Sequence, residues 1–95
     1  MTSNRRLETR ELTLLTLYSN CQFSMDVFEF YRKWNVTQKQ IAIICGCSIA
    51  TVGRWFGSPR QVPEFIYMRR LAEMDLIWEL WEQIPDELKE RLCSR

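Results

Sequence analysis

The chain has 95 residues, of which 46% are hydrophobic and 26% are charged, and its formal net charge is +1. A chain of this length makes one small domain with a modest core, without room for a second folded unit. It has no histidine, no glycine-rich phosphate loop and no paired carboxylates outside its acidic C-terminal region. We therefore expect no enzymatic activity, no cofactor and no small-molecule ligand.

Glycine and proline number only three each, and apolar residues recur at intervals of three and four. This pattern predicts an all-α fold, a small helical bundle of about five helices. No apolar run approaches the roughly 18 residues needed to cross a bilayer, and the first residues lack the apolar core of a signal peptide. We expect a soluble, cytoplasmic protein without membrane contact, whose four cysteines are reduced thiols rather than metal ligands or disulfides.

The first 22 residues are predicted to form an arm and a helix. Residues 7–18 are rich in leucine with threonines interspersed, which predicts a short amphipathic helix packed across the bundle. Arg5 and Arg6 precede it, and they could form a basic arm that reaches a DNA minor groove. An unordered start of the chain is an equal alternative.

Residues 23–57 are expected to form a trihelical core. Ser24 can cap its first helix. Five side chains of that helix recur at the spacing of one stripe: Phe23, Val27, Phe30, Tyr31 and Trp34. The helical spacing favours a place in the core over stacking on the bases of a single strand.

The most informative segment is residues 37–57, which is predicted to form a helix-turn-helix. Thr37 and Gln40 have the spacing of a capping box. Ile41, Ile44 and Cys45 then share one apolar face of the first helix.

The turn of this motif centres on Gly46, where a left-handed backbone can redirect the chain. Ala42 supplies a small side chain where the second helix must pass close. Cys45 and Cys47 flank the glycine at apolar positions, so both thiols are expected to face the core as small hydrophobes. Ser48 is a suitable cap for the second helix.

The second helix, residues 48–56, is the predicted recognition helix. Val52 and Trp55 lie three apart and should point back to the core. The side chains left on its outer face are Ile49, Ala50, Gly53 and Arg54. An outer face of this kind is the part of a recognition helix that meets DNA.

Residues 37–57 resemble the helix-turn-helix of phage-repressor-like (XRE-like) and related bacterial regulators. In that family the first helix carries an alanine, the turn a glycine, and the second helix an aliphatic residue followed by tryptophan or isoleucine. The matching residues here are Ala42, Gly46, Val52 and Trp55. The continuation GSPRQVPEFIYMRRLAEMD is similar to the family's next helix, and the match covers roughly 40 residues.

More loosely, the whole chain is similar to short cyanobacterial helix-turn-helix proteins. One departure from the larger family concerns its base-reading amides, Gln or Asn early in the recognition helix. Ile49 and Ala50 stand at those positions. The resemblance therefore implies a DNA-binding fold more strongly than it implies discrimination among base sequences.

Residues 63–95 are predicted to form the C-terminal helices. Pro63 suits the first position of a helix that should run to about residue 83, and Pro85 the start of a last helix in which Leu88 and Leu92 face inward. Four residues of the longer helix follow a three-four-three rhythm: Leu71, Met74, Trp78 and Trp81.

This apolar surface of the C-terminal helices would form either a core beneath the N-terminal helix or the interface of a homodimer. We favour the homodimer, with Met74, Trp78, Trp81 and Leu88 at its interface.

The charges are segregated along the chain. Residues 32–70 carry a net charge of +6, whereas residues 1–31 carry −1 and residues 71–95 carry −4. The cations of the basic segment are Arg32, Lys33, Lys39, Arg54, Arg60, Arg69 and Arg70. Cations beside a recognition helix release counterions from phosphates, so this segment has the charge expected of a DNA-binding surface. A solvated surface without a partner is the alternative.

The sequence thus predicts a sequence-preferring double-stranded DNA-binding protein, a small transcriptional regulator that inserts residues 48–56 in the major groove. Arg54 would be the main base or phosphate contact, and Ile49 and Ala50 could touch thymine methyl groups. The candidate DNA-binding residues are Gln38, Lys39, Ser48, Ile49, Ala50, Thr51, Gly53, Arg54 and Arg60. Two alternatives remain: a protein interaction adaptor that uses its tryptophan-rich C-terminal helices, and a DNA-targeting accessory subunit of a recombinase or transposase.

Overall fold

The computed structural model describes residues 4–20 and 22–93 and is all-helical over them, as predicted. The described residues form six α-helices and one 3-10 helix, and none of them lies in a β-strand. The helices are α1 (Thr9–Asn20), α2 (Val27–Lys33), α3 (Gln38–Cys45), α4 (Ile49–Trp55), α5 (Phe65–Glu79) and α6 (Asp86–Cys93), with the 3-10 helix at Trp81–Gln83. None of the described helices has the length and apolar composition that a membrane span requires.

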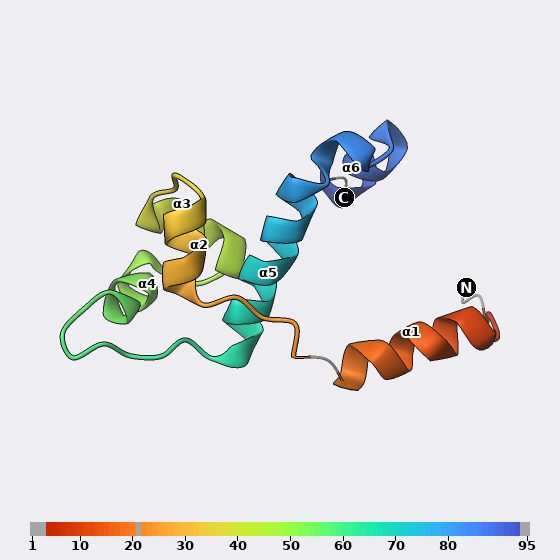
Figure 1. The fold of residues 1–95 in the computed structure, drawn as a ribbon, viewed down its shortest axis with the longest axis horizontal. Helices are drawn as coiled ribbons and strands as arrows, with labels where there is room; N and C mark the ends of the chain where they lie inside the picture. Colours follow the sequence, from red (N-terminus) through yellow and green to blue (C-terminus); the bar gives the residue numbers. More distant parts are fainter. Residues whose placement is uncertain (1–3, 21, 94–95) are drawn as a thin grey trace.

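One hydrophobic core lies where α2, α3, α4 and α5 meet (Figure 1). Its buried residues include Val27 and Phe30 of α2, Ile41 of α3, Val52 of α4 and Leu71 of α5, each with no exposed surface. The period of three to four predicted these positions, because it places one face of each helix against its neighbours. The middle of the chain therefore folds around most of the residues that the periodicity singled out. Tyr31 was also predicted for the core but is 47% exposed, because it packs on Phe56 at the edge of the core.

The ends of α3 and α4 confirm the predictions made for residues 37–48. The Thr37 side chain accepts a hydrogen bond from the Gln40 amide, and the Gln40 side chain accepts one from the Thr37 amide. Gly46 adopts a left-handed backbone (φ 72°, ψ 36°), in which a Cβ would be strained. Ser48 caps α4 by accepting a hydrogen bond from the Thr51 amide at 3.0 Å.

The cap of α2 differs from the prediction, because Asp26 rather than Ser24 occupies the N-cap. The Asp26 carboxylate accepts from the Phe28 amide at 3.0 Å, and the Glu29 side chain accepts from the Asp26 amide. A carboxylate near a helix N-terminus also interacts favourably with the helix dipole, which a serine hydroxyl does not. Helix α2 therefore begins at Val27, and Phe23 lies outside it.

The predicted bounds of α5 were too wide at both ends. The chain is still extended at Glu64 (φ −67°, ψ 155°), and the Glu64 carbonyl accepts the first helical hydrogen bonds from Tyr67 and Met68. Pro63 is buried but precedes the helix. At the other end α5 stops at Glu79, and a separate 3-10 helix follows. The apolar rhythm continued through this break, because a 3-10 turn has a period close to that of an α-helix.

The terminal helices do not pack as predicted. Helix α1 extends away from the core and α6 continues from the far end of α5, so the two lie apart from each other (Figure 1). Leu88 and Leu92 of α6 were expected to face inward but are 47% and 53% exposed. The core beneath the N-terminal helix is thus absent from the described residues. The radius of gyration, 16.2 Å, accordingly exceeds the value of about 13 Å for a compact domain of 100 residues.

Candidate nucleic-acid interface

The α3–α4 pair presents the face on which most of the predicted DNA contacts lie. Val52 and Trp55 are buried on the inner side of α4, as predicted, and fix its rotation about its own axis. Ile49 is 51% exposed, and Ala50 and Arg54 are also exposed on the outer side. Gly53 is half-buried. The outer face therefore combines small apolar groups with one arginine.

A chain of hydrogen bonds along α4 links three of the predicted contacts. The hydroxyls of Ser48 and Thr51 lie 2.9 Å apart, and the Arg54 Nη2 donates to Thr51 Oγ1 at 3.2 Å. The two hydroxyls thus have partners within the helix. The Thr51 hydroxyl holds the Arg54 guanidinium against α4. The other N–H groups of Arg54 can then donate to another molecule.

Gln38, at the start of α3, lies opposite the middle of α4. A Cβ added to Gly53 would lie 4.0 Å from the Gln38 Oε1, an ordinary van der Waals contact. Gly53 has no left-handed φ, so neither its backbone nor its surroundings require glycine. Glycine in a helix interior costs roughly 0.5–1 kcal/mol relative to alanine. A glycine that weakens a helix without a structural need marks a candidate site of close approach by another molecule.

The basic segment has less available charge than its formal net charge of +6 indicated. Arg60 donates to an Asp26 carboxylate oxygen at 2.9 Å and stacks 4.1 Å from the centre of the Phe28 ring. Arg69 is only 7% exposed and lies over the Tyr18 ring. These contacts were not predicted, because they join residues more than 30 positions apart.

Lys33 is likewise engaged, between two carboxylates of α5. Its Nζ lies 2.8 Å from an Asp75 carboxylate oxygen and 2.7 Å from a Glu79 carboxylate oxygen. The hydrogen bond to Asp75, and to a smaller extent the one to Glu79, raises the pKa of Lys33. Burial pushes the pKa of Asp75 up, but hydrogen bonds from Lys33 and from the Trp34 indole outweigh it and lower that pKa. The cluster joins the end of α2 to α5, and its two carboxylates neutralise the charge of Lys33.

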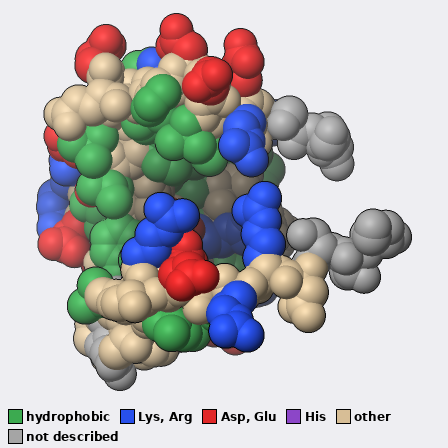
Figure 2. Space-filling view, turned by 90° about the vertical axis from the view of Figure 1, so that its right-hand side faces the viewer, with side chains coloured by type: hydrophobic (Ala, Val, Ile, Leu, Met, Phe, Trp, Pro, Cys, Tyr) green, Lys and Arg blue, Asp and Glu red, His purple; other side chains and the backbone are tan. Residues whose placement is uncertain are grey.

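Four cations of the basic segment form no ion pair with the described residues: Arg32, Lys39, Arg54 and Arg70. Lys39 and Arg54 belong to α3 and α4. The Arg70 guanidinium lies beside the turn, 3.7 Å from the place of a Cβ on Gly46. Figure 2 shows acidic side chains gathered at the top of the molecule, over α6, whereas α4 lies on the opposite side of the core (Figure 1). The remaining cations near the α3–α4 pair are thus distant from the acidic helix.

The two cysteines of the turn have different environments. Cys45 is 2% exposed and its thiol lies 3.8 Å from the Tyr67 carbonyl, whereas Cys47 is half-buried. Burial raises the pKa of Cys45 to about 12 and also raises that of Cys47. A thiol with a raised pKa is a weak nucleophile, because the thiolate is the reactive form. No group of three metal-ligating side chains occurs among the described residues, and Cys21 lies outside them.

The residues that carry the likeness to phage-repressor-like regulators have the environments which that likeness implies. Ala42, Val52 and Trp55 are buried, and Gly46 is left-handed. Comparison of the chain with models of known protein families, with curated proteins and with solved structures finds no match. Membership of that family therefore stays a prediction.

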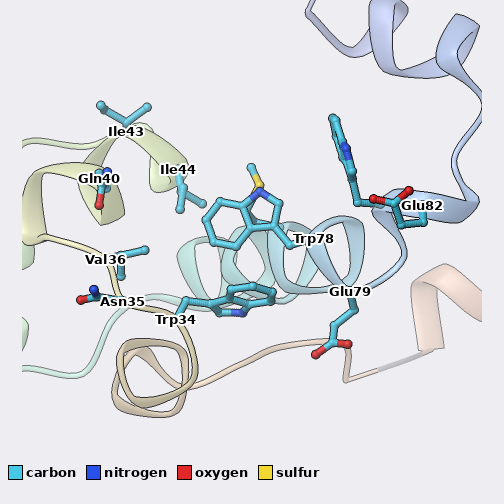
Figure 3. A pocket seen from close by; sticks show the side chains of 11 residues that line it. Trp34, Asn35, Val36, Gln40, Ile43, Ile44, Trp78, Glu79 and Glu82 are labelled. Carbon is cyan, nitrogen blue, oxygen red and sulfur yellow. The ribbon is translucent and has the colours of Figure 1, made fainter.

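Three of the four residues of the predicted dimer interface line an open groove (Figure 3). Met74 and Trp78 are half-buried at its floor, and Trp81 at its edge is 44% exposed. Leu88 of α6 is exposed but does not line it. Sequence reasoning missed Ile43, which is 70% exposed at the groove. Ile43 is two residues from both Ile41 and Cys45, so it lies on the opposite side of α3 from these core residues. This spacing is the signal in the sequence that could have identified it as exposed.

Proposed function

We propose that the protein is a double-stranded DNA-binding protein, a small transcriptional regulator that places the outer face of α4 in the major groove. The observation that carries this proposal is Gly53, a glycine in the middle of α4 that the fold does not need. Close approach of a DNA backbone or base edge explains it, because a Cβ there would separate the helix from the groove. An α-helix with its side chains is about 10–12 Å across, which a major groove about 12 Å wide admits.

Each exposed residue of α4 then has a role that its chemistry supports. Arg54, held by Thr51, donates to guanine or to a phosphate. Ile49 and Ala50 contact thymine methyl groups. Gln38 and Lys39 at the start of α3 bind the DNA backbone and position α4, since phosphate contacts fix register without carrying sequence information. Arg60 has the weakest claim to a phosphate contact, because Asp26 already binds it.

We further propose that the protein acts in the cytoplasm by occupying its site, without catalysing a reaction, and that it binds DNA as a homodimer. Two copies related by a twofold axis would present two α4 helices to paired half-sites. The groove beside α5 does not include α4 (Figure 3). Assembly through that groove would therefore leave both α4 faces free for DNA.

A second function, as a protein interaction adaptor, is favoured by one observation. Ile43 and Trp81 are exposed at an apolar groove, which is the form that a docking site for a helix takes. An adaptor would keep its partner when Arg54 is replaced, whereas a DNA-binding protein would lose affinity for DNA.

Fluorescence anisotropy with labelled duplex DNA over a salt series tests the main proposal. For wild type we expect affinity that falls steeply with salt, because bound cations release counterions. Arg54→Ala should weaken binding by about 1–3 kcal/mol if Arg54 contacts a base, or lower the salt slope by about 1 if it contacts a phosphate. Arg10→Ala removes the same charge from α1 and serves as the matched control. Absence of binding at low salt by folded protein would refute the proposal.

A further inference from the structure

An open apolar groove runs between α3 and the C-terminal half of α5 (Figure 3). Its volume is about 920 Å³. Trp34 and Trp78 meet edge to face at its floor, with ring centres 4.9 Å apart. Ile43 and Trp81, at its two edges, are 70% and 44% exposed. Large apolar side chains gathered around one hollow on a small protein mark an interaction surface.

The same chain also presents a helix whose leucines are uncovered, α1. Its leucines are exposed by about half or more: Leu12 (49%), Leu14 (66%), Leu15 (54%) and Leu17 (62%), with Leu7 (52%) before the helix. Leu14 and Leu15 share one face with Tyr18, and Leu7 lies beside them. An isolated helix of about 12 residues is only marginally stable in water, so such a helix depends on packing of its apolar face. Helix α1 therefore needs a surface to cover it.

Helix α1 does not cover the groove of its own chain, because it points away from the groove (Figure 1). The Tyr18 ring lies 3.9 Å from the Arg69 guanidinium, and the Met25 amide donates to the Met68 carbonyl at 3.0 Å. Both contacts are on the N-terminal half of α5, and from there α1 extends away from the core (Figure 1). Trp78 lies nine residues further along α5, about 13 Å away. The groove and α1 thus belong to opposite ends of α5.

We propose that α1 of a second copy of this chain occupies the groove, and that the two copies exchange their α1 helices in this way. Each chain offers one helix and one groove, so a reciprocal exchange satisfies both and closes with twofold symmetry. An amphipathic helix in an apolar groove is a common mode of recognition. Glu11, on the same face of α1 as Leu14 and Leu15, is neutralised by its ion pair with Arg10. Arg5 and Arg6 precede α1, and Glu82 of the groove has the complementary charge. None of these three residues forms an ion pair with the described residues.

This exchange rests on one part of the proposed function, the homodimer, and says how that dimer forms. It does not depend on DNA binding. Multi-angle light scattering and sedimentation velocity of the full chain without DNA test it directly. Over a range of about 1–100 µM, which spans ordinary dimer affinities, wild type should have twice the 11.5 kDa chain mass. A wild-type mass of one chain throughout that range would overturn the exchange.

Two variants address the two sides of the contact. Leu14→Glu with Leu15→Glu places charge on the apolar face of α1, and Ile43→Glu places charge in the groove. Each should weaken the dimer by about tenfold or more, because a charge buried without a partner is costly. Thr13→Glu with Thr16→Glu adds the same charge to the opposite side of α1 and should leave the dimer unchanged. All these positions are exposed within one chain, so near-ultraviolet circular dichroism from the buried Trp55 should stay as in wild type. Loss of the dimer itself lowers the helicity of α1 and the thermal midpoint.

A mixture of the two weakened variants separates the exchange from a dimer formed groove to groove. The intact α1 of the Ile43→Glu chain can enter the intact groove of the α1 variant, so the mixture should recover dimers that neither variant forms alone. A dimer that survives the α1 variant, or a mixture that stays monomeric, would overturn the exchange. Anisotropy with DNA, measured separately, reports on the proposed DNA binding alone.

Discussion

Replacement of Gly53 by alanine should stabilise the fold and weaken DNA binding at the same time. The new Cβ would lie 4.0 Å from the Gln38 Oε1 with nothing closer, so the folded state has room for it. Alanine then gains about 0.5–1 kcal/mol over glycine in a helix interior. For a domain of this size the gain corresponds to a thermal midpoint raised by about 2–8 °C.

The same methyl group projects from the outer face of α4 at the point where the proposal brings DNA closest. Overfilling a close-packed contact costs typically about 1–3 kcal/mol, which corresponds to a dissociation constant raised by about 5- to 150-fold. Urea denaturation, thermal unfolding and anisotropy with duplex DNA measure the two effects on one protein sample.

Ala50→Gly, in the same helix, calibrates the stability effect, since it should lower the free energy of unfolding by a similar amount. If Gly53→Ala lowers the free energy of unfolding, the space inferred beside Gly53 does not exist. If it stabilises the protein and DNA affinity is unchanged, then close approach to DNA does not explain the glycine.

Two further predictions concern contacts that join distant parts of the chain. Asp26→Ala should lower the free energy of unfolding by about 1–2 kcal/mol, because it removes the N-cap of α2 and the ion pair with Arg60. Asp26→Asn retains a capping oxygen and should lower it by less than half as much. Equal losses for the two variants in urea denaturation would contradict this account. The lowered pKa of Asp75 means that its carboxylate contributes stability above the ordinary value of 3.8, and that this contribution is lost as the pH falls through the lower pKa of the folded state. Asp75→Asn should therefore flatten the acid side of the curve of unfolding free energy against pH, and parallel curves for the two proteins would show that the pKa of Asp75 is not lowered by folding.

The parts of the fold that sequence predicted best are local. Thr37 with Gln40, the left-handed Gly46 and the Ser48 cap each depend on residues within four positions, so backbone geometry and hydrogen-bonding capacity suffice to predict them. The cap of α2 was also within reach, because Asp26 and Glu29 have capping-box spacing. Ser24 has Val27 at that spacing, and a valine cannot complete a capping box.

Contacts between distant residues could not be predicted in the same way. Arg60 and Asp26 are 34 positions apart, and nothing in either segment indicates that the loop after α4 returns to the start of α2. For the same reason, a count of cations over residues 32–70 overstated the charge available to phosphates. Leucine periodicity predicted α1, but periodicity identifies an apolar face without identifying the surface that covers it.

The segment between α4 and α5 is held at several points although it has no regular structure. The Gln61 amide donates to the Arg54 carbonyl at 3.1 Å, Arg60 is bound to Asp26, and Phe56 packs edge to face on Phe28. Helix α4 is consequently fixed at its C-terminal end as well as through its buried side chains. A molecule that binds its outer face meets a surface that is already ordered, so association there loses little conformational entropy of the protein and need not wait for a folding step.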